Sequence, residues 1–261
     1  LDSLGAYGAI LSMVITTIIK SIFFIYYTRN FFRLDFRFDM LKSTIQFSFP
    51  LIFHGIGAYL FTLSDRVILE KYVPLAMIGL YSIGDRLSSV MKFLVNSIND
   101  TVSPDFMESS KSNFPKTILR YKNIISIWCV GIIISFILIY FLIYIYVKLF
   151  LPPNYQDVIL FIPYLTGAYI FRGLYCFFMY PLIYKKKVFW IPLITVLSGI
   201  VNILINILLI PKFGVIVAAW STLIAFLTTS ILSYFISNKF KIIKVNFFTL
   251  IESLIIGAVA I

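Results

Sequence analysis

Residues Ile124–Val147 read IISIWCVGIIISFILIYFLIYIYV, a run of 24 residues without a charged side chain. An α-helix needs about 20 consecutive apolar residues to cross the hydrocarbon core of a bilayer. A strand of a membrane barrel instead alternates apolar and polar residues over about 10 positions. The run therefore predicts a transmembrane helix and excludes a barrel strand.

Similar runs fill the rest of the 261-residue chain, of which 61% is hydrophobic and 13% charged. This composition is too apolar for a soluble domain. We expect an all-α, polytopic membrane protein with spans at residues 4–28, 44–70, 75–104, 118–147, 157–184, 188–210, 214–236 and 246–261. The longest expected loop is 105–117. The last span stops short of the about 20 residues that a crossing needs, so we expect the chain to be part of a longer protein.

Basic residues alternate between the connections. Of the 22 Lys and Arg residues, 14 fall in every second connection, in the segments 29–42, 111–122, 185–187 and 239–244. This is the positive-inside pattern, and it predicts that these connections face the cytoplasm. Anionic membrane lipids are the expected partners of the net charge of +11, so no nucleic-acid partner is expected.

Charged side chains also fall within the expected spans, where they are costly and usually functional. The span at 75–104 has a polar stripe at helical spacing, formed by Ser82, Asp85, Ser89, Lys92, Asn96, Asn99 and Ser103. We expect this stripe, with Arg86 beside it, to face the bundle interior or a wet cavity. Asp85, Arg86, Lys92 and Asn96 are therefore candidate substrate-binding residues. The alternative is an internal network in which Asp85 pairs with Arg86 or Lys92.

Four further residues within the spans have two interpretations each. Arg172 presents a planar fork suited to phosphate oxygens, but it could equally pair with a carboxylate such as Asp85. Asp65 and Arg66 suggest an ion pair or gate near the outer mouth rather than a substrate contact. His54, the single histidine, is a possible proton relay or a helix-packing residue.

Enzyme chemistry is not expected from this sequence. It has no cluster of His and Cys ligands, no nucleophile motif and no glycine-rich phosphate loop. The expected outer connections are only a few residues long. We therefore predict a non-enzyme without catalytic residues, metal or cofactor.

Three stretches of the sequence resemble a known family. They are Phe49–Gly57 (FPLIFHGIG) with Ser64–Leu69 (SDRVIL), Ile78–Ser82 (IGLYS), and Ile210–Val215 (IPKFGV) with Ala218–Thr222 (AAWST). They are similar to bacterial polysaccharide-repeat-unit flippases, the O-antigen and capsule exporters of the multidrug/oligosaccharidyl-lipid/polysaccharide (MOP) superfamily. The family often has glycine where this chain has Val217.

The resemblance implies the C-terminal part of a two-lobed, MATE-like transporter of 12–14 helices. Residues 1–28 would be the last helix of the first lobe, 29–43 a cytoplasmic linker, 44–236 the second lobe, and 246–261 an additional, truncated helix. Such a protein would flip undecaprenyl-diphosphate-linked oligosaccharides across the bacterial cytoplasmic (inner) membrane by alternating access, with a polysaccharide polymerase as a possible partner. Multidrug efflux, flipping of a peptidoglycan precursor, and a membrane-embedded glycan polymerase or ligase are the alternatives.

Overall fold

The computed structural model describes residues 5–31 and 38–240, and every regular element in these ranges is helical. The chain divides into two units, residues 1–44 and 45–261. The first contains α1 (Gly5–Thr28), η1 (Arg29–Phe31) and the start of α2 (Phe38–Leu69). The second contains the rest of α2, then α3 (Leu75–Phe150), η2 (Pro153–Leu160), α4 (Ile162–Tyr184), α5 (Trp190–Phe213) and α6 (Ile216–Lys239).

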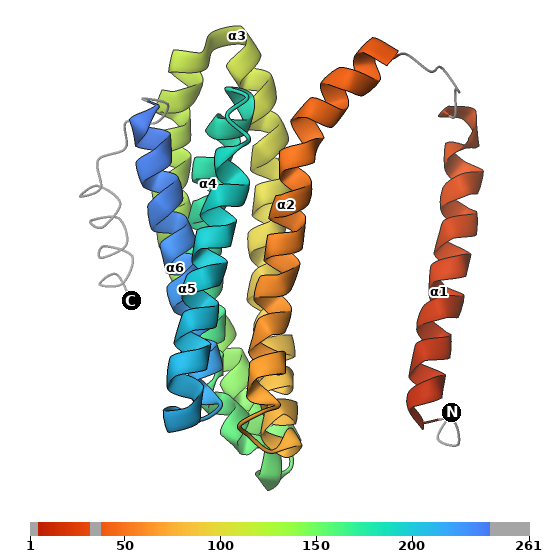
Figure 1. The fold of residues 1–261 in the computed structure, drawn as a ribbon, viewed down its shortest axis with the longest axis vertical. Coiled ribbons are helices and arrows are strands. Elements are labelled where there is room, and N and C mark those ends of the chain that lie inside the picture. The colour runs from red at the N-terminus through yellow and green to blue at the C-terminus, as the bar shows by residue number, and fades with distance from the viewer. Residues whose placement is uncertain (1–4, 32–37, 241–261) are drawn as a thin grey trace. The chain divides into compact units, whose positions relative to one another are not determined.

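Helix α3 is a hairpin rather than one straight rod (Figure 1). Its 76 residues are interrupted at Asn113, whose φ of −154° and ψ of 89° are not helical. The Asn113 side-chain oxygen accepts the backbone N–H of Lys116 at 3.1 Å, which caps the second arm. The expected loop at 105–117 is therefore wrong, because both arms continue through that segment and only Asn113 breaks them.

Contacts with α4 hold this turn in place. The Tyr184 hydroxyl donates to the Ser110 carbonyl at 2.7 Å, and its ring stacks on Phe114 with centroids 5.2 Å apart. The Lys185 ammonium lies 4.1 Å from the centre of the Phe114 ring. At least one of the basic residues in the expected cytoplasmic connections therefore has a packing role besides setting topology.

Five described helical segments are long and apolar enough to cross a membrane: Ile10–Phe31, Leu75–Phe150, Pro153–Tyr184, Trp190–Phe213 and Ile216–Lys239. Because the second of these contains both arms of α3, six of the eight expected spans are accounted for. The expected span 44–70 is helical but is not among the five, since α2 also carries polar residues such as Asp65, Arg66 and His54. The expected span 246–261 lies outside the described residues.

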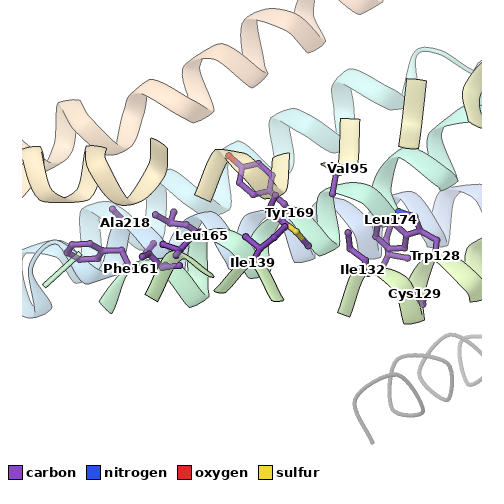
Figure 2. Close-up of a cluster of buried hydrophobic side chains, with 14 of the residues drawn as sticks. Val95, Trp128, Cys129, Ile132, Ile139, Phe161, Leu165, Tyr169, Leu174 and Ala218 are labelled. Carbon is purple, nitrogen blue, oxygen red and sulfur yellow. The ribbon is translucent and has the colours of Figure 1, made fainter. Parts of the chain in front are cut away.

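The core of the second unit lies where α3, α4 and α6 pack together, and α5 packs against α6. Figure 2 shows Trp128 and Ile132 of the second α3 arm beside Leu174 of α4. At Gly173 the two elements approach so closely that an added Cβ would lie 2.1 Å from the Trp128 ring. The absence of a side chain at this position is thus what lets the indole lie against α4.

The end of α4 has a strained residue that offers a stability test. Lys186 has a φ of +56°, and the Lys187 N–H bonds the Leu182 carbonyl at 2.8 Å, the pattern of a helix terminus that favours glycine. We expect Lys186→Gly to stabilise the protein by about 1 kcal/mol by relieving this strain. Thermal unfolding in detergent measures the change. Lys185→Gly is the control, and should destabilise because that residue has a φ of −80° and lies over Phe114; an unchanged or lower melting temperature for Lys186→Gly would contradict the argument.

Candidate functional site

A buried carboxylate lies at the end of the second unit opposite the Asn113 turn. Asp65 of α2 is 5% exposed, and three side chains from three other helices contact it. Asn206 of α5 lies 2.6 Å from one carboxylate oxygen, while Tyr81 of α3 and Thr222 of α6 each lie 3.1 Å from the other. Side chains of four helices, α2, α3, α5 and α6, therefore converge on one acidic group.

The hydroxyl protons at this site are not sufficient for every contact. Thr222 has one proton, and its oxygen lies 2.8 Å from the Ala218 carbonyl as well as 3.1 Å from Asp65. If that proton is donated to Ala218, the contact between Thr222 and Asp65 joins two acceptors. A proton on Asp65 or a cation between the two oxygens would then be needed to make the contact favourable.

The hydrogen-bond network extends from Asp65 along α5. The Asn206 amide also donates to Asn202, 3.2 Å away, and Asn202 donates in turn to Ser221 at 3.1 Å. Ser64 donates to the Asn202 oxygen at 3.3 Å. The Asn206 side-chain oxygen is buried with no hydrogen-bond partner among the described residues.

This cluster is rich in oxygen and poor in nitrogen and sulfur donors. In residues 5–31 and 38–240, no group of three or more His, Cys, Asp and Glu side chains comes together. One carboxylate with amide, hydroxyl and carbonyl oxygens is a donor set for a hard cation or a proton. The Asn206 side chain turns its NH₂ group, not its unpartnered oxygen, toward Asp65.

Arg66 pairs with Asp85 rather than with its neighbour Asp65. The guanidinium lies 3.2 Å from the Asp85 carboxylate, and both side chains are about 40% exposed. Arg66 thus forms an ion pair, with Asp85 as its partner, and the gating role of Asp65 and Arg66 stays a prediction. The alternatives in which Asp85 pairs with Arg86, Lys92 or Arg172 are not what this structure shows. A half-exposed pair of this kind adds little stability.

The polar stripe of α3 lies at the edge of the packed face, not within it. The buried positions of the first arm are Leu80, Tyr81, Gly84, Ser88, Met91, Val95, Asn99, Phe106 and Ser110. Arg86, Ser89 and Lys92 are exposed in this chain, while Asp85 and Asn96 are half-buried. Of the stripe residues only Asn99 is buried within this chain, and the expectation that the stripe faces the bundle interior or a wet cavity stays a prediction.

Arg172 lies half-buried on α4. It is close enough to His54, Tyr169 and Tyr175 to interact with them electrostatically. It makes no hydrogen bond or ion pair with another residue of the described ranges. Its positive charge is therefore available to a ligand.

His54 is held by α5. Its Nδ1 lies 2.6 Å from the Thr195 hydroxyl, and that hydroxyl also lies 3.1 Å from the Ile191 carbonyl. If Thr195 donates to Ile191, Nδ1 is the donor to Thr195 and Nε2 the acceptor in the neutral ring; if Thr195 donates to Nδ1, the proton lies on Nε2. This contact supports the helix-packing interpretation, and the proton-relay role stays a prediction.

The sequence did not indicate the partners of Asp65. Thr195, Asn202 and Asn206 of α5 bond residues of α2 and α6, so this face of α5 joins neighbouring helices. Tyr81 and Thr222 belong to the stretches that resemble the flippase family, but nothing in their spacing relates them to Asp65.

Residues 3–110 match the family model described as polysaccharide biosynthesis protein. The match covers α1, α2 and most of the first arm of α3, with Asp65, Arg66 and Asp85 inside it. No protein of curated function matches the chain significantly.

Two solved transporters share the fold. One is a multidrug-resistance MATE-family transporter of the MOP superfamily in an outward-facing conformation, at 14% identity and a TM-score of 0.55, covering 82% of this chain and 50% of that one. The other is a MOP-superfamily transporter from Pyrococcus furiosus, described as having a binding pocket of reverse polarity, at 16% identity and a TM-score of 0.51, covering 83% and 51%. This chain thus spans about half the length of each. The family match and the shared fold confirm the expected all-α, MATE-like architecture of a multi-pass membrane protein and its similarity to the polysaccharide biosynthesis family.

Proposed function

We propose that this protein moves an undecaprenyl-diphosphate-linked oligosaccharide from the inner to the outer leaflet of the bacterial cytoplasmic membrane, for surface polysaccharide synthesis. Residues 44–236 are proposed to form one lobe of the transporter, with 1–28 and 29–43 as the last helix of the other lobe and the linker. The family match at residues 3–110 and the MATE-like fold support this proposal.

The main support for a diphosphate-linked substrate is that Arg172 has no ion pair among the described residues. A guanidinium within a membrane-spanning helix is costly unless a partner compensates it. Arg172 is half-buried and has no ion pair among the described residues. A diphosphate is a suitable partner because its oxygens match the planar fork of arginine. Arg86 and Lys92 are exposed on α3, and they are proposed to extend the cationic path, with Asp85 and Asn96 beside them.

We infer a coupling role for the buried carboxylate. Asp65 would hold a proton or a hard cation together with Asn206 and Thr222, and neutralisation of its charge would favour one packing of α2 against α5 and α6 over another. Arg66 and Asp85, next to it on the exposed side, would make or break their pair as α2 moves. The arrangement of four helices around a single charge supports this role.

The test is transport in cells that lack the chromosomal copy of the gene. We expect Arg172→Gln to lower surface polysaccharide export at least about tenfold, because a charge-assisted hydrogen bond contributes about 1.5–3 kcal/mol. The repeat units should accumulate in the inner leaflet. Lys148→Gln is the control, because Lys148 is exposed and bonded to Gln156 away from this path.

Other outcomes assign other functions. The proposed cationic path would be contradicted if export is unchanged both in Arg172→Gln and in the double variant Arg86→Gln/Lys92→Gln. Normal glycan with new sensitivity to cationic drugs in the deletion strain would indicate efflux. Repeat units that reach the outer leaflet but are not polymerised would indicate a polymerase or ligase.

A further inference from the structure

The Asn113 turn of α3 contains a basic, hydroxyl-rich pocket that the proposed transport path does not use. Its volume is about 230 Å³, and its lining residues are Ser109, Ser112, Asn113, Lys116, Thr117 and Arg120. Arg120 is 3.3 Å from Asp105, whereas Lys116 has no acidic partner among the described residues. The Ser112 and Thr117 hydroxyls donate their protons to backbone carbonyls of the same turn. The pocket therefore has an excess of positive charge, with the Lys116 ammonium as its unpaired donor, and this suits a phosphate.

An apolar groove lies farther along the same hairpin. It has a volume of about 300 Å³, with Leu94 and Ile98 of the first arm on one side and Ile124, Ile127 and Gly131 of the second arm on the other. A Cβ added at Gly131 would meet no atom within 4 Å, so the groove is open at this position. Its chemistry suits a hydrocarbon chain and no polar ligand.

The two cavities lie on the same face of the hairpin at a fixed spacing. Four residues of the pocket each lie 11 positions before a residue of the groove. The pairs are Asn113 and Ile124, Lys116 and Ile127, Thr117 and Trp128, and Arg120 and Gly131. Eleven residues are about three helical turns and correspond to about 16 Å along the axis. That length is close to one leaflet of a hydrocarbon core about 30 Å thick.

A third cavity, of about 250 Å³, lies at the end of the hairpin away from Asn113, and the same spacing of 11 residues separates it from the groove. Ile139, Leu142 and Tyr146 line it, 11 positions beyond Trp128, Gly131 and Ser135. It contains no basic residue. Among these three cavities, a phosphate site next to an apolar groove thus occurs only at the Asn113 end, which the basic residues place at the cytoplasmic face.

We propose that the α3 hairpin binds one anionic phospholipid of the cytoplasmic leaflet, with its phosphate against Lys116 and Arg120 and an acyl chain in the groove beside Gly131. Charge complementarity selects the headgroup, and the distance between pocket and groove matches a lipid lying in one leaflet. The lipid bridges the two arms of the hairpin, because the groove has walls from both.

The preference for an anionic headgroup is tested by native mass spectrometry. The protein is purified in detergent and titrated with phosphatidylglycerol, or with phosphatidylcholine that has the same acyl chains. We expect one phosphatidylglycerol to stay bound under conditions that remove phosphatidylcholine. Lys116→Gln should weaken its binding about fivefold, the effect of one basic residue near an anionic lipid. Lys111→Gln is the matched control: this lysine is exposed on the same hairpin but does not line the pocket. Equal binding of the two lipids, or equal effects of the two variants, would overturn the proposal.

The groove is tested by filling it. Gly131→Phe should abolish retention of phosphatidylglycerol, while Gly79→Phe, also on α3 at a position where an added Cβ meets nothing within 4 Å, should leave it unchanged. Retention in Gly131→Phe would overturn the assignment of the acyl chain. Displacement of the lipid by inorganic phosphate alone would show a site for a soluble anion and overturn the lipid. If Gly131→Phe does not fold, the lysine comparison still decides.

Discussion

Replacing Gly173 with alanine is expected to separate α4 from the second arm of α3 and to destabilise the protein by about 3 kcal/mol, the upper part of the usual range for overpacking. The added Cβ would lie 2.1 Å from one carbon of the Trp128 ring and 2.6 Å from another. The indole has little room to move, because it is 5% exposed and its ring packs against Phe177 with centroids 5.3 Å apart. Thermal unfolding and the fraction of monodisperse protein in detergent measure the effect.

A second substitution distinguishes this clash from a general intolerance of α4. Trp128→Leu combined with Gly173→Ala should be more stable than the sum of the two single effects by about 2 kcal/mol, since the smaller side chain leaves room for the Cβ. Gly131→Ala, on the second arm of α3, is the control for helix propensity. It meets no atom within 4 Å and should not destabilise. Additive effects of Trp128→Leu and Gly173→Ala would show that the ring is not what excludes a side chain at position 173.

The sequence predicts the membrane segments well, because long apolar runs are a local property of the chain. It does not predict where helices end outside the apolar runs. The segment 105–117 is polar and contains Pro115, and so it resembles a loop. It is nevertheless helical on both sides of Asn113, because the side chain of that residue caps the second arm and Phe114 stacks on Tyr184. The second contact joins residues 70 positions apart, which no local pattern specifies.

Prediction of the site fails for a different reason. Asp65 and Arg66 are neighbours in sequence, yet successive residues of a helix point about 100° apart and do not face each other. Arg66 therefore reaches α3 while Asp65 faces α5 and α6. The polar residues of α3 do recur at helical spacing, but Tyr81, Met91 and Val95 form the packed face beside them. Which of two adjacent faces is buried depends on the other helices.

Replacing Asp65 with alanine is expected to destabilise the protein by at least about 3 kcal/mol and to abolish transport. The substitution removes the acceptor of the Tyr81 hydroxyl and of one N–H of the Asn206 amide, whose other N–H keeps Asn202 as its acceptor. In a region of low dielectric constant, unpaired donors cost more than the lost bonds alone. Thermal unfolding in detergent and the leaflet distribution of repeat units measure the two effects.

Asp65→Asn separates the structural role from the charge. The new amide keeps one acceptor oxygen for Asn206, and its N–H group can donate to Thr222, whose own proton is donated to the Ala218 carbonyl. The Tyr81 hydroxyl loses the oxygen that accepted its proton, so this variant should be less stable than the native protein by about 1–2 kcal/mol, but more stable than Asp65→Ala because the Asn206 amide keeps its acceptor. Transport should still be lost, since an amide neither releases a proton nor attracts a cation. Transport in Asp65→Asn at the native rate would assign Asp65 a packing role only, and native stability in Asp65→Ala would show that the four helices do not depend on this carboxylate.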